Sequence, residues 1–313
     1  MTAITPASHR GYQRRPSIEF AIGNTPLIEL SRLAEDLPRG VKVFAKAEYL
    51  NPGGSVKDRP ALAMILAAEE QGLLHPGKTI LDASSGNTGI AYGMIGAARG
   101  YAVTLCLPRN ASPERKAILN AFGVEIIETS PLEGTDGAQA LAKQLAEEFP
   151  ERYAYLDQYN NQANWYAHYE TTGPEIWEQT KGGVTHFIAG LGTTGTFTGT
   201  ASRLKAYDPK IKVLALQPDS PLHGIEGLKH LPTTRIPGIY DPSLADNHVS
   251  IETEAGRQMK LRLAREEGLF VGASSGANVF AALRLARSLP AGSIVVTILC
   301  DGGERYFSDS SFP

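Results

Sequence analysis

Lys57 is the residue in this sequence whose position most clearly suggests chemistry. It lies in the stretch LNPGGSVKDR at 50–59, where proline and two glycines indicate a turn and Ser55 is a candidate helix N-cap. The apolar residues that follow predict a helix over 56–70, so Lys57 would lie in its first turn. Because a helix N-terminus disfavours positive charge, the Lys57 amine should lose its proton more readily than usual and could attack a carbonyl group. The alternative is an ordinary surface lysine whose charge is offset by Asp58.

Two further loops carry polar groups that could hold an anion. The segment SSGNTG at 84–89 offers hydroxyls, an amide and backbone N–H groups where a helix is predicted to start, which suits a carboxylate. Serine and asparagine in such a place could also do no more than cap the helix. The segment GLGTTGT at 190–196 has glycines that let the backbone approach a phosphate, and threonine hydroxyls that could bind it.

The segment at 190–196 also satisfies the pattern GxGxxG after a strand, with Asp219 ending the next strand. That pattern occurs in dinucleotide-binding proteins, so a nicotinamide-dependent oxidoreductase is an alternative in which Lys57 would be incidental. The additional threonines favour a single phosphate. The segment GASSG at 272–276 is by itself a helix start, and no Ser-His-Asp arrangement surrounds its serines. A lysine, a phosphate loop and polar loops for a carboxylate and a ring together suit pyridoxal phosphate.

These loops must be positioned by alternating strands and helices. Strand patterns occur at 41–47, 79–83, 102–107, 124–128, 186–189, 213–217 and 294–300. Helix patterns occur at 56–70, 87–100, 113–122, 134–149, about 196–207, 253–267 and 275–288. This alternation predicts an α/β fold with a mostly parallel sheet. The polar, aromatic stretch 157–169 interrupts it and is predicted to mark a domain crossing, and the Pro-, Gly- and Thr-rich segment 218–250 is a candidate active-site loop.

Composition narrows the class of protein. The chain has 313 residues, of which 42% are hydrophobic and 20% charged, enough for one large or two smaller soluble domains. The net charge of −3 lacks the positive excess that is typical of nucleic-acid-binding proteins. Cys106 and Cys300 lie in apolar runs, and no metal-ligand spacing is present, so we expect no metal centre. No apolar run is long enough to span a membrane, and we expect a cytoplasmic protein.

Six segments in order resemble one family of enzymes. They are NPGGSVKDR, SSGNTG, HYETTGPEIW, GLGTTGT, GASSG and DGGERY, and the resemblance runs from about residue 23 to 308. The chain resembles the pyridoxal-phosphate enzymes of the cysteine synthase and cystathionine β-synthase family, with GTTGT and CDGGERY most similar to the B isozymes of cysteine synthase. The resemblance implies the fold called type II, with two three-layer domains, mostly parallel sheets and the cofactor in the cleft between them. It implies a smaller mobile domain over 45–152, a larger domain over 12–44 plus 153–313, and a homodimer.

The resemblance also implies roles for individual residues. Lys57 would bind pyridoxal phosphate as a Schiff base and act as the general base, Asn87 would bind the 3′ oxygen of the ring, and Ser274 would face the pyridine nitrogen. A serine hydroxyl there makes the ring a weaker electron sink, which favours prompt loss of a β-leaving group. The residues implied to bind the phosphate are Gly192, Thr193, Thr194, Gly195 and Thr196. Those implied to bind the substrate carboxylate are Ser84, Ser85, Gly86, Thr88 and Gln158.

The implied reaction is a β-replacement. Acetate leaves from O-acetyl-L-serine after Lys57 has removed the α-proton, sulfide adds at the β-carbon, and L-cysteine departs. Lys229 and Arg235 in the segment 218–250 suggest the hypothesis that anionic substrates, thiosulfate or O-phosphoserine, are also accepted. Their alternative role is that of a solvated basic loop. A complex with a serine acetyltransferase stays open.

Some residues depart from the family pattern, and other functions remain possible at this point. Ser84 stands where threonine is usual, and Gln162 and Trp165 replace two prolines, so the loop beside Gln158 could have a different shape. A bare cystathionine β-synthase core acting on serine and homocysteine is one alternative. Threonine dehydratase has the same fold but fits HYETTGPEIW and DGGERY less well. A non-catalytic binding protein would not need an intact lysine and phosphate loop.

Overall fold

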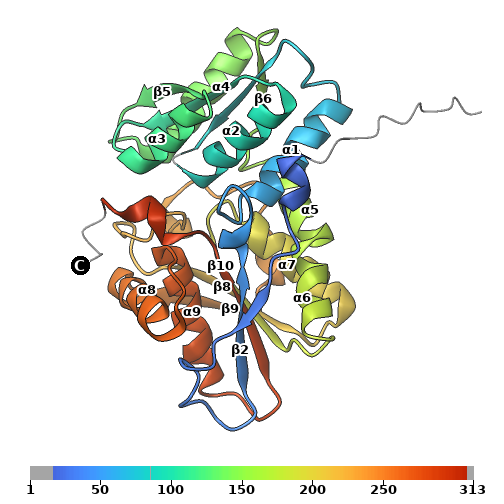
Figure 1. The fold of residues 1–313 in the computed structure, drawn as a ribbon, viewed down its shortest axis with the longest axis vertical. Helices are drawn as coiled ribbons and strands as arrows, with labels where there is room; N and C mark the ends of the chain where they lie inside the picture. The colour runs from blue at the N-terminus through green and yellow to red at the C-terminus, as the bar shows by residue number, and fades with distance from the viewer. Residues whose placement is uncertain (1–16, 85, 309–313) are drawn as a thin grey trace, which may run out of the picture.

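The computed structural model describes residues 17–84 and 86–308, which form two sheets with helices on both faces (Figure 1). The larger sheet has six strands. In spatial order they are β1 (Leu27–Glu29), β2 (Lys42–Ala47), β10 (Ile294–Leu299), β7 (His186–Gly190), β8 (Lys212–Pro218) and β9 (Asn247–Ile251). All neighbouring pairs are parallel except β1 with β2. The smaller sheet is parallel throughout, and its strands in spatial order are β5 (Glu125–Thr129), β4 (Val103–Pro108), β3 (Thr79–Ala83) and β6 (Tyr153–Tyr155).

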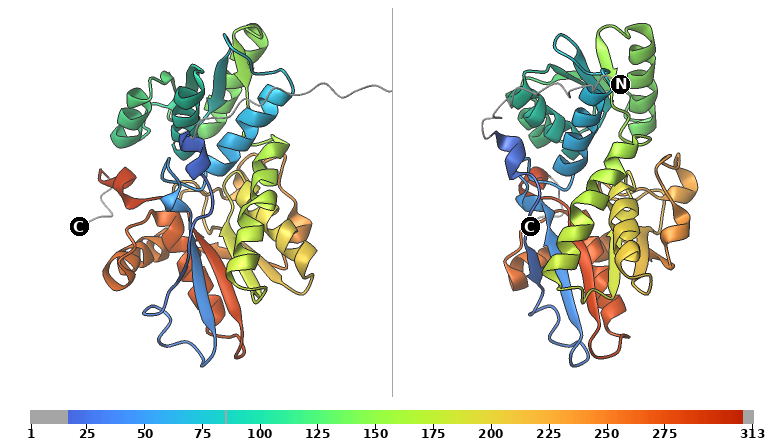
Figure 2. Two further views of the ribbon diagram at one scale, coloured as in Figure 1. Left: turned by 45° about the vertical axis from the view of Figure 1, so that its right-hand side comes forward. Right: turned by 90° about the vertical axis from the view of Figure 1, so that its right-hand side faces the viewer.

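Helices cover both faces of each sheet, as the predicted α/β class requires. The helices near the smaller sheet are α1 (Asp58–Glu70), α2 (Asn87–Arg99), α3 (Pro113–Ala121) and α4 (Gly134–Glu148). Those around the larger sheet are α5 (Gln162–Glu170), α6 (Thr172–Gln179), α7 (Gly195–Tyr207), α8 (Thr253–Glu267) and α9 (Ala273–Ala286). Figures 1 and 2 show α8 and α9 on one face of the larger sheet and α6 and α7 on the other. Short 3-10 helices are η1 (Ile18–Ala21), η2 (Glu48–Leu50), η3 (Leu231–Thr233), η4 (Pro242–Leu244) and η5 (Gly303–Tyr306).

Burial on both faces explains why the central strands read as continuous apolar runs. Every residue of β4 is buried, and so are four of the five residues of β3. One face of the smaller sheet packs with α1 and α2 in a cluster that includes Met64, Ile90 and Leu105. The opposite face packs against Ala138 and Ala142 of α4. Parallel sheets covered on both sides in this way have no solvated face and so no alternation of polar residues.

The chain passes from one sheet to the other twice. It leaves the larger sheet after β2, at Ala47, and returns through α5 after β6, which ends at Tyr155. The larger sheet therefore includes β2 up to residue 47, and the smaller sheet includes β6 up to residue 155. Both positions are within a few residues of the domain boundaries expected at 45 and 152. Figure 1 shows the two sheets in separate lobes, with α5 running from one lobe to the other.

The structure refines two local predictions and corrects a third. The stretch 157–169 interrupts the alternation as expected, because α5 and α6 follow each other before β7, but it is helical from Gln162, and Asn161 caps α5 by accepting a hydrogen bond from Ala163 N. The segment 218–250 is irregular as expected, apart from η3, η4 and the beginning of β9. Ser55 is not the N-cap of α1: Lys57 holds that position, and the Ser55 hydroxyl accepts the Lys57 N–H at 3.2 Å. Ser55 instead forms an isolated antiparallel bridge with Asp301.

No helix among the described residues is both long and apolar enough to cross a bilayer.

Candidate active site

A cavity of about 340 Å³ lies between the two lobes and contains nearly all the residues singled out from the sequence. Lys57, Ser84, Gly86, Asn87, Thr88, Gln158, Gly192, Thr193, Thr194, Thr196, Lys229 and Ser274 all line it. Its walls come from the loops at the carboxyl ends of β3, β7 and β10, where parallel sheets bind ligands. Ser85 lies outside the described residues, and Gly195 lies behind the cavity wall, buried at the first position of α7.

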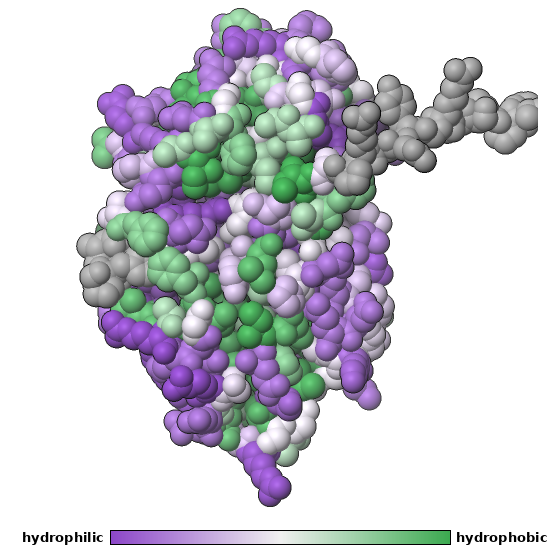
Figure 3. Space-filling view, viewed as in Figure 1, coloured by the Kyte–Doolittle hydropathy of each residue, from purple (hydrophilic) through white to green (hydrophobic). Residues whose placement is uncertain are grey.

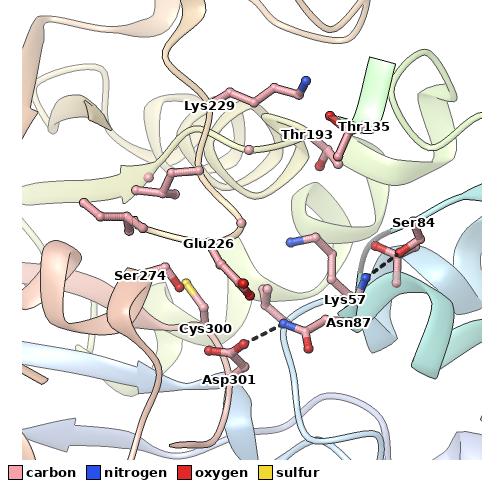
Figure 4. A pocket seen from close by; sticks show the side chains of 18 of the residues that line it. Lys57, Ser84, Asn87, Thr135, Thr193, Glu226, Lys229, Ser274, Cys300 and Asp301 are labelled. Atoms are coloured by element: carbon pink, nitrogen blue, oxygen red, sulfur yellow. Dashed lines mark hydrogen bonds between the residues drawn. The ribbon is translucent and has the colours of Figure 1, made fainter. Parts of the chain in front are cut away.

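Lys57 points its amine into this cavity between the two lobes. Figure 4 shows the side chain reaching in with Ser84 on one side and Ser274 and Cys300 on the other. Burial lowers the pKa of the Lys57 amine, although the neighbouring Cys300 and Asp301 side chains act in the opposite direction. The predicted direction of the shift is therefore the same as that in the structure, but its largest cause is burial and not the start of α1. A neutral amine is the nucleophilic and basic form.

The loop after β7 is shaped by close backbone contacts. A Cβ at Gly192 would lie 2.2 Å from the carbonyl oxygen of Gly227, so only glycine fits there. Thr194 has a left-handed backbone with φ of 71°, which is rare for a β-branched residue, and its hydroxyl is buried without a hydrogen-bond partner. An unpaired hydroxyl beside the first N–H groups of α7 forms a ready site for a phosphate.

Two side chains of α5 support this loop and were not singled out from the sequence. Asn164 donates hydrogen bonds to Thr193 Oγ1 at 3.3 Å and to the Gln158 carbonyl at 2.6 Å. His168 Nε2 lies 3.2 Å from Thr196 Oγ1, and its Nδ1 lies 2.8 Å from Thr172 Oγ1. Burial, with help from the charges of Arg59 and Lys57, lowers the pKa of His168 well below its usual range, so the ring is neutral. The only sequence signal was that His168 belongs to the motif HYETTGPEIW.

Asn87 begins α2 and meets the C-terminal part of the chain. Its Nδ2 donates to Asp301 Oδ2 at 2.6 Å, drawn as a dashed line in Figure 4, and Tyr306 donates to the same oxygen at 2.5 Å. Arg305 donates to Asn87 Oδ1 at 2.5 Å. These contacts fix the orientation of the Asn87 amide. Ser274 is buried on the far side of the cavity, in the first turn of α9.

The loop after β3 and the segment after β6 meet at Gln158. Thr88 Oγ1 donates to Gln158 Oε1 at 2.7 Å, and Gln158 Nε2 donates to the Ala83 carbonyl at 2.6 Å. The Ser84 hydroxyl accepts from Gly86 N and Gly89 N, at 3.3 and 3.0 Å. These groups lie on the side of the cavity that belongs to the smaller sheet.

Charged residues line the mouth of the cavity and join the two lobes. Arg115 of α3 forms an ion pair with Glu226, and Lys229 lies 3.5 Å from Asp136 of α4 and 5.0 Å from the centre of the Tyr159 ring. Arg115 was missed from the sequence because an arginine in an amphipathic helix looks like a solvated residue. Arg235 does not share this cavity: it is exposed and lines a separate one with Lys143 and Asp157.

This set of groups fits pyridoxal phosphate. A lysine amine with a lowered pKa, an unpaired threonine hydroxyl at a helix start, and the polar side chains of Asn87 and Ser274 surround one cavity. Such donors can bind an aldehyde, a phosphate and the polar edge of a ring. The described residues contain no cluster of histidine, cysteine or acidic side chains suited to a metal ion.

The family comparison agrees with this chemistry. The family model described as pyridoxal-phosphate dependent enzyme matches residues 18–301. Together with two mostly parallel α/β sheets around a lysine-containing cavity, this match defines an enzyme of the pyridoxal-phosphate class with fold type II. The chain belongs to that family, and among its members it groups with the cysteine synthases. The oxidoreductase suggested by the GxGxxG pattern is therefore set aside.

Three relatives place the chain within the family. A cysteine synthase of Aquifex aeolicus is 51% identical, over 95% of this chain and 92% of the relative. Cysteine synthase B of Salmonella typhimurium is 45% identical, over 95% of this chain and 96% of the relative. Among solved structures, the O-acetylserine dependent cystathionine beta-synthase from Helicobacter pylori is 36% identical with a TM-score of 0.90, over 96% of this chain and 99% of that one.

Proposed function

We propose that this protein is a cysteine synthase that replaces the β-substituent of O-acetyl-L-serine with sulfide. The observation that carries the proposal is the buried Lys57 amine, which shares a cavity with the phosphate-type loop at 190–196 and the polar loop at 84–89. The names of the Aquifex aeolicus and Salmonella typhimurium relatives support the same activity. Pyridoxal phosphate, when bound, supplies an electron sink that stabilises negative charge at the substrate α-carbon.

Different residues of the cavity are proposed to bind the cofactor, bind the substrate and transfer the proton. Lys57 would hold the cofactor, and its neutral amine would be the base that takes the α-proton of the substrate and later returns it. Thr193, Thr194 and Thr196 bind the phosphate with the N–H groups at the start of α7. Ser84, Thr88 and Gln158 bind the substrate carboxylate, and the smaller lobe carries all three. Asn87 and Ser274 would hold the polar edge of the ring.

The test combines covalent trapping with turnover. Borohydride reduction of the holoenzyme, followed by peptide mass spectrometry, should place the cofactor adduct on Lys57, and Lys57→Ala should lower kcat at least about a thousandfold through loss of the base and nucleophile. Stopped-flow spectroscopy with O-acetylserine, O-phosphoserine and serine should give the fastest cofactor change with O-acetylserine. An adduct on another side chain, or equal rates with serine, would contradict the proposal.

A second candidate activity comes from the Helicobacter pylori structure. That protein is named as an O-acetylserine dependent cystathionine synthase, so its sulfur donor is a thiol larger than sulfide. Comparing kcat/KM for sulfide and for homocysteine in the same assay decides between the two activities. We expect sulfide to be preferred.

We further propose that anionic sulfur donors or acceptors, such as thiosulfate or O-phosphoserine, interact with Lys229. Its amine lines the cavity mouth, and a compact anion there would replace the carboxylate of Asp136 as its partner. Arg235 has no such place in the cavity, so the hypothesis now rests on Lys229 alone.

Three properties of the whole protein are also proposed. The lobes close on substrate, because the carboxylate-binding loop lies on one lobe and the phosphate loop on the other; structures with and without an amino acid test this.

The protein is a homodimer, since Figure 3 shows apolar side chains gathered over the region of β2 and β10, and Phe20 and Leu50 are 61% and 52% exposed. Sedimentation analysis measures that state. The two free cysteines agree with a cytoplasmic location, which fractionation would check.

A further inference from the structure

A buried carboxylate lies beneath the loop that we propose binds the substrate carboxylate. Asp82, the fourth residue of β3, has no solvent exposure. Its Oδ1 accepts a hydrogen bond from Ala83 N at 2.8 Å, and its Oδ2 accepts from Tyr92 Oη at 2.9 Å and from Gln158 N at 3.1 Å. All three donors are neutral. Burial raises the pKa of Asp82 to about 7, so holding its charge there is costly.

Through these bonds Asp82 connects two segments that are far apart in the sequence. Gln158 N comes from the segment after β6, and Ala83 leads into the loop at 84–89. The Gln158 side chain returns to the same place, because its Nε2 donates to the Ala83 carbonyl. The backbone and the side chain of Gln158 are thus fixed by two consecutive residues at the end of β3. The Gln158 amide nitrogen carries two hydrogens, and one remains available to a ligand.

The backbone before Gln158 is bent so that this bond can form. Asp157 has a left-handed conformation with φ of 46°, which is uncommon for any residue other than glycine. Its carboxylate accepts two hydrogen bonds from Asn160 Nδ2, at 2.9 and 2.8 Å, which help to hold the turn. In this conformation the N–H of Gln158 faces back toward Asp82.

We propose that Asp82 is a positioning residue that sets the place of Gln158 and thereby the affinity for the substrate carboxylate. The proposal rests on the function proposed above for Gln158. One carboxylate oxygen can accept two donors while the other accepts a third, and no neutral side chain of this size does so. An asparagine at position 82 would turn an N–H₂ group toward at least one of the three donors.

The experiment is a double-mutant cycle in the holoenzyme. Asp82→Asn should raise KM for O-acetylserine about tenfold, because one buried acceptor is lost, while KM for sulfide and kcat change less than about threefold. In a Gln158→Ala background, Asp82→Asn should add less than about a twofold change, since the group that it positions is gone. Tyr92→Phe removes a donor to the same oxygen but does not touch Gln158, and it should leave KM for O-acetylserine within about twofold.

The outcomes separate this inference from the proposed function. If Gln158→Ala leaves KM for O-acetylserine unchanged, the proposed carboxylate site is wrong. Suppose that Gln158→Ala does raise KM for O-acetylserine. If Asp82→Asn then raises this KM by the same factor with and without Gln158, or by no more than Tyr92→Phe does, Asp82 has only a general structural role and the inference is overturned.

A second pair of variants tests the same idea without changing the buried carboxylate. Asp157→Gly and Asp157→Val both lose the bonds to Asn160, but only glycine readily adopts a positive φ. The valine variant should therefore show the raised KM for O-acetylserine and the glycine variant should not. Equal KM values in the two variants would contradict the inference, even if Asp82→Asn fails to fold.

Discussion

At the scale of single residues, the proposal that the site accepts anionic substrates depends on Lys229. Its side chain is 9% exposed, and its amine is balanced by Asp136 at 3.5 Å and by the Tyr159 ring at 5.0 Å. A neutral or singly charged donor such as sulfide needs no additional cation. A more highly charged donor would gain from one, because charges at a partly buried site are weakly screened.

Lys229→Ala should therefore separate two classes of donor. We expect KM for thiosulfate, or for O-phosphoserine as acceptor, to rise about tenfold, and KM for sulfide to change less than about twofold. Arg235→Ala is the matched control, since Arg235 lines a different cavity and should leave all three values unchanged. Steady-state assays with each substrate measure this, and a uniform change across substrates would remove Lys229 from the specificity argument.

The residues of the site were predictable from the sequence to the extent that chemistry requires a particular side chain. Lys57, Asn87 and Ser274 lie around one cavity as expected. Arg115 and Asp82 were not predictable, because each lies in a pattern, an amphipathic helix or an apolar strand, that gives a polar residue no distinctive context. Arg235 is the opposite case, a residue that was predicted to belong to the site but does not: it lies in the expected segment and lines a different cavity.

At the scale of elements, the start of α7 combines two unfavourable features at Thr194. A threonine with positive φ is strained, and a buried hydroxyl without a partner loses the hydrogen bond that water would provide. Both features are understandable if a phosphate binds there, because the ligand would then satisfy the hydroxyl and the N–H groups together.

Substitutions at Thr194 should trade apoprotein stability against cofactor affinity. Thr194→Ala and Thr194→Gly both remove the hydroxyl and should weaken pyridoxal phosphate binding to a similar degree. Only glycine relieves the backbone strain, so the apoprotein of Thr194→Gly should be about 1 kcal/mol more stable than that of Thr194→Ala. Cofactor titration and urea unfolding measure the two quantities. Equal stabilities would show that the positive φ is not strained.

The sequence predicted most elements because burial on both faces leaves a strong apolar signal, as in β3 and β4. It failed where an element is short or polar. Strand β6 has three residues, too few for a pattern to be recognised. Helix α5 has the polar sequence QANWYAHYE, and only Asn164, Ala167 and His168 of it are buried, so its helical periodicity is weak.

At the scale of the whole molecule, a buried ion-pair network joins the larger sheet, α1 and α6. Arg59 pairs with Glu48 at 2.7 Å and with Glu175 at 2.6 Å, and Lys46 pairs with Glu175 at 2.6 Å. Burial alone would raise the pKa of Glu175, but the hydrogen bonds and charges of Arg59 and Lys46 outweigh it and lower the pKa below 4.5. The network fixes the start of α1, and Lys57 lies two residues before Arg59.

Glu175→Gln should destabilise the protein by roughly 3–5 kcal/mol at pH 7, because buried Lys46 would lose its ion-pair partner and Arg59 would keep only Glu48. The pKa of Glu175 is lower in the folded chain, so its contribution is present above pH 4.5 and is lost as the pH falls through the folded-state value. The difference between the variant and the original protein should therefore shrink in acid.

Denaturant unfolding at several pH values measures this difference. Glu178→Gln is the control, since Glu178 is an exposed acid in the same helix and its substitution should change stability by less than about 0.5 kcal/mol. A difference between Glu175→Gln and the original protein that stays constant from pH 7 to pH 3 would mean that the network does not act through charge.

The position of β10 in the larger sheet has a consequence for biosynthesis. It is the last strand of the described residues, yet it lies between β2 and β7 and pairs with both. The smaller sheet, by contrast, is built from the continuous segment 79–155 and could become ordered while the ribosome is still translating. The larger sheet cannot pair β2 and β7 with their common neighbour until β10 has been synthesised. Until then the apolar edges of these strands are exposed to aggregation or to chaperones. Cys300 and Asp301 follow directly, so the nascent chain completes its catalytic cavity in the same event that closes its core.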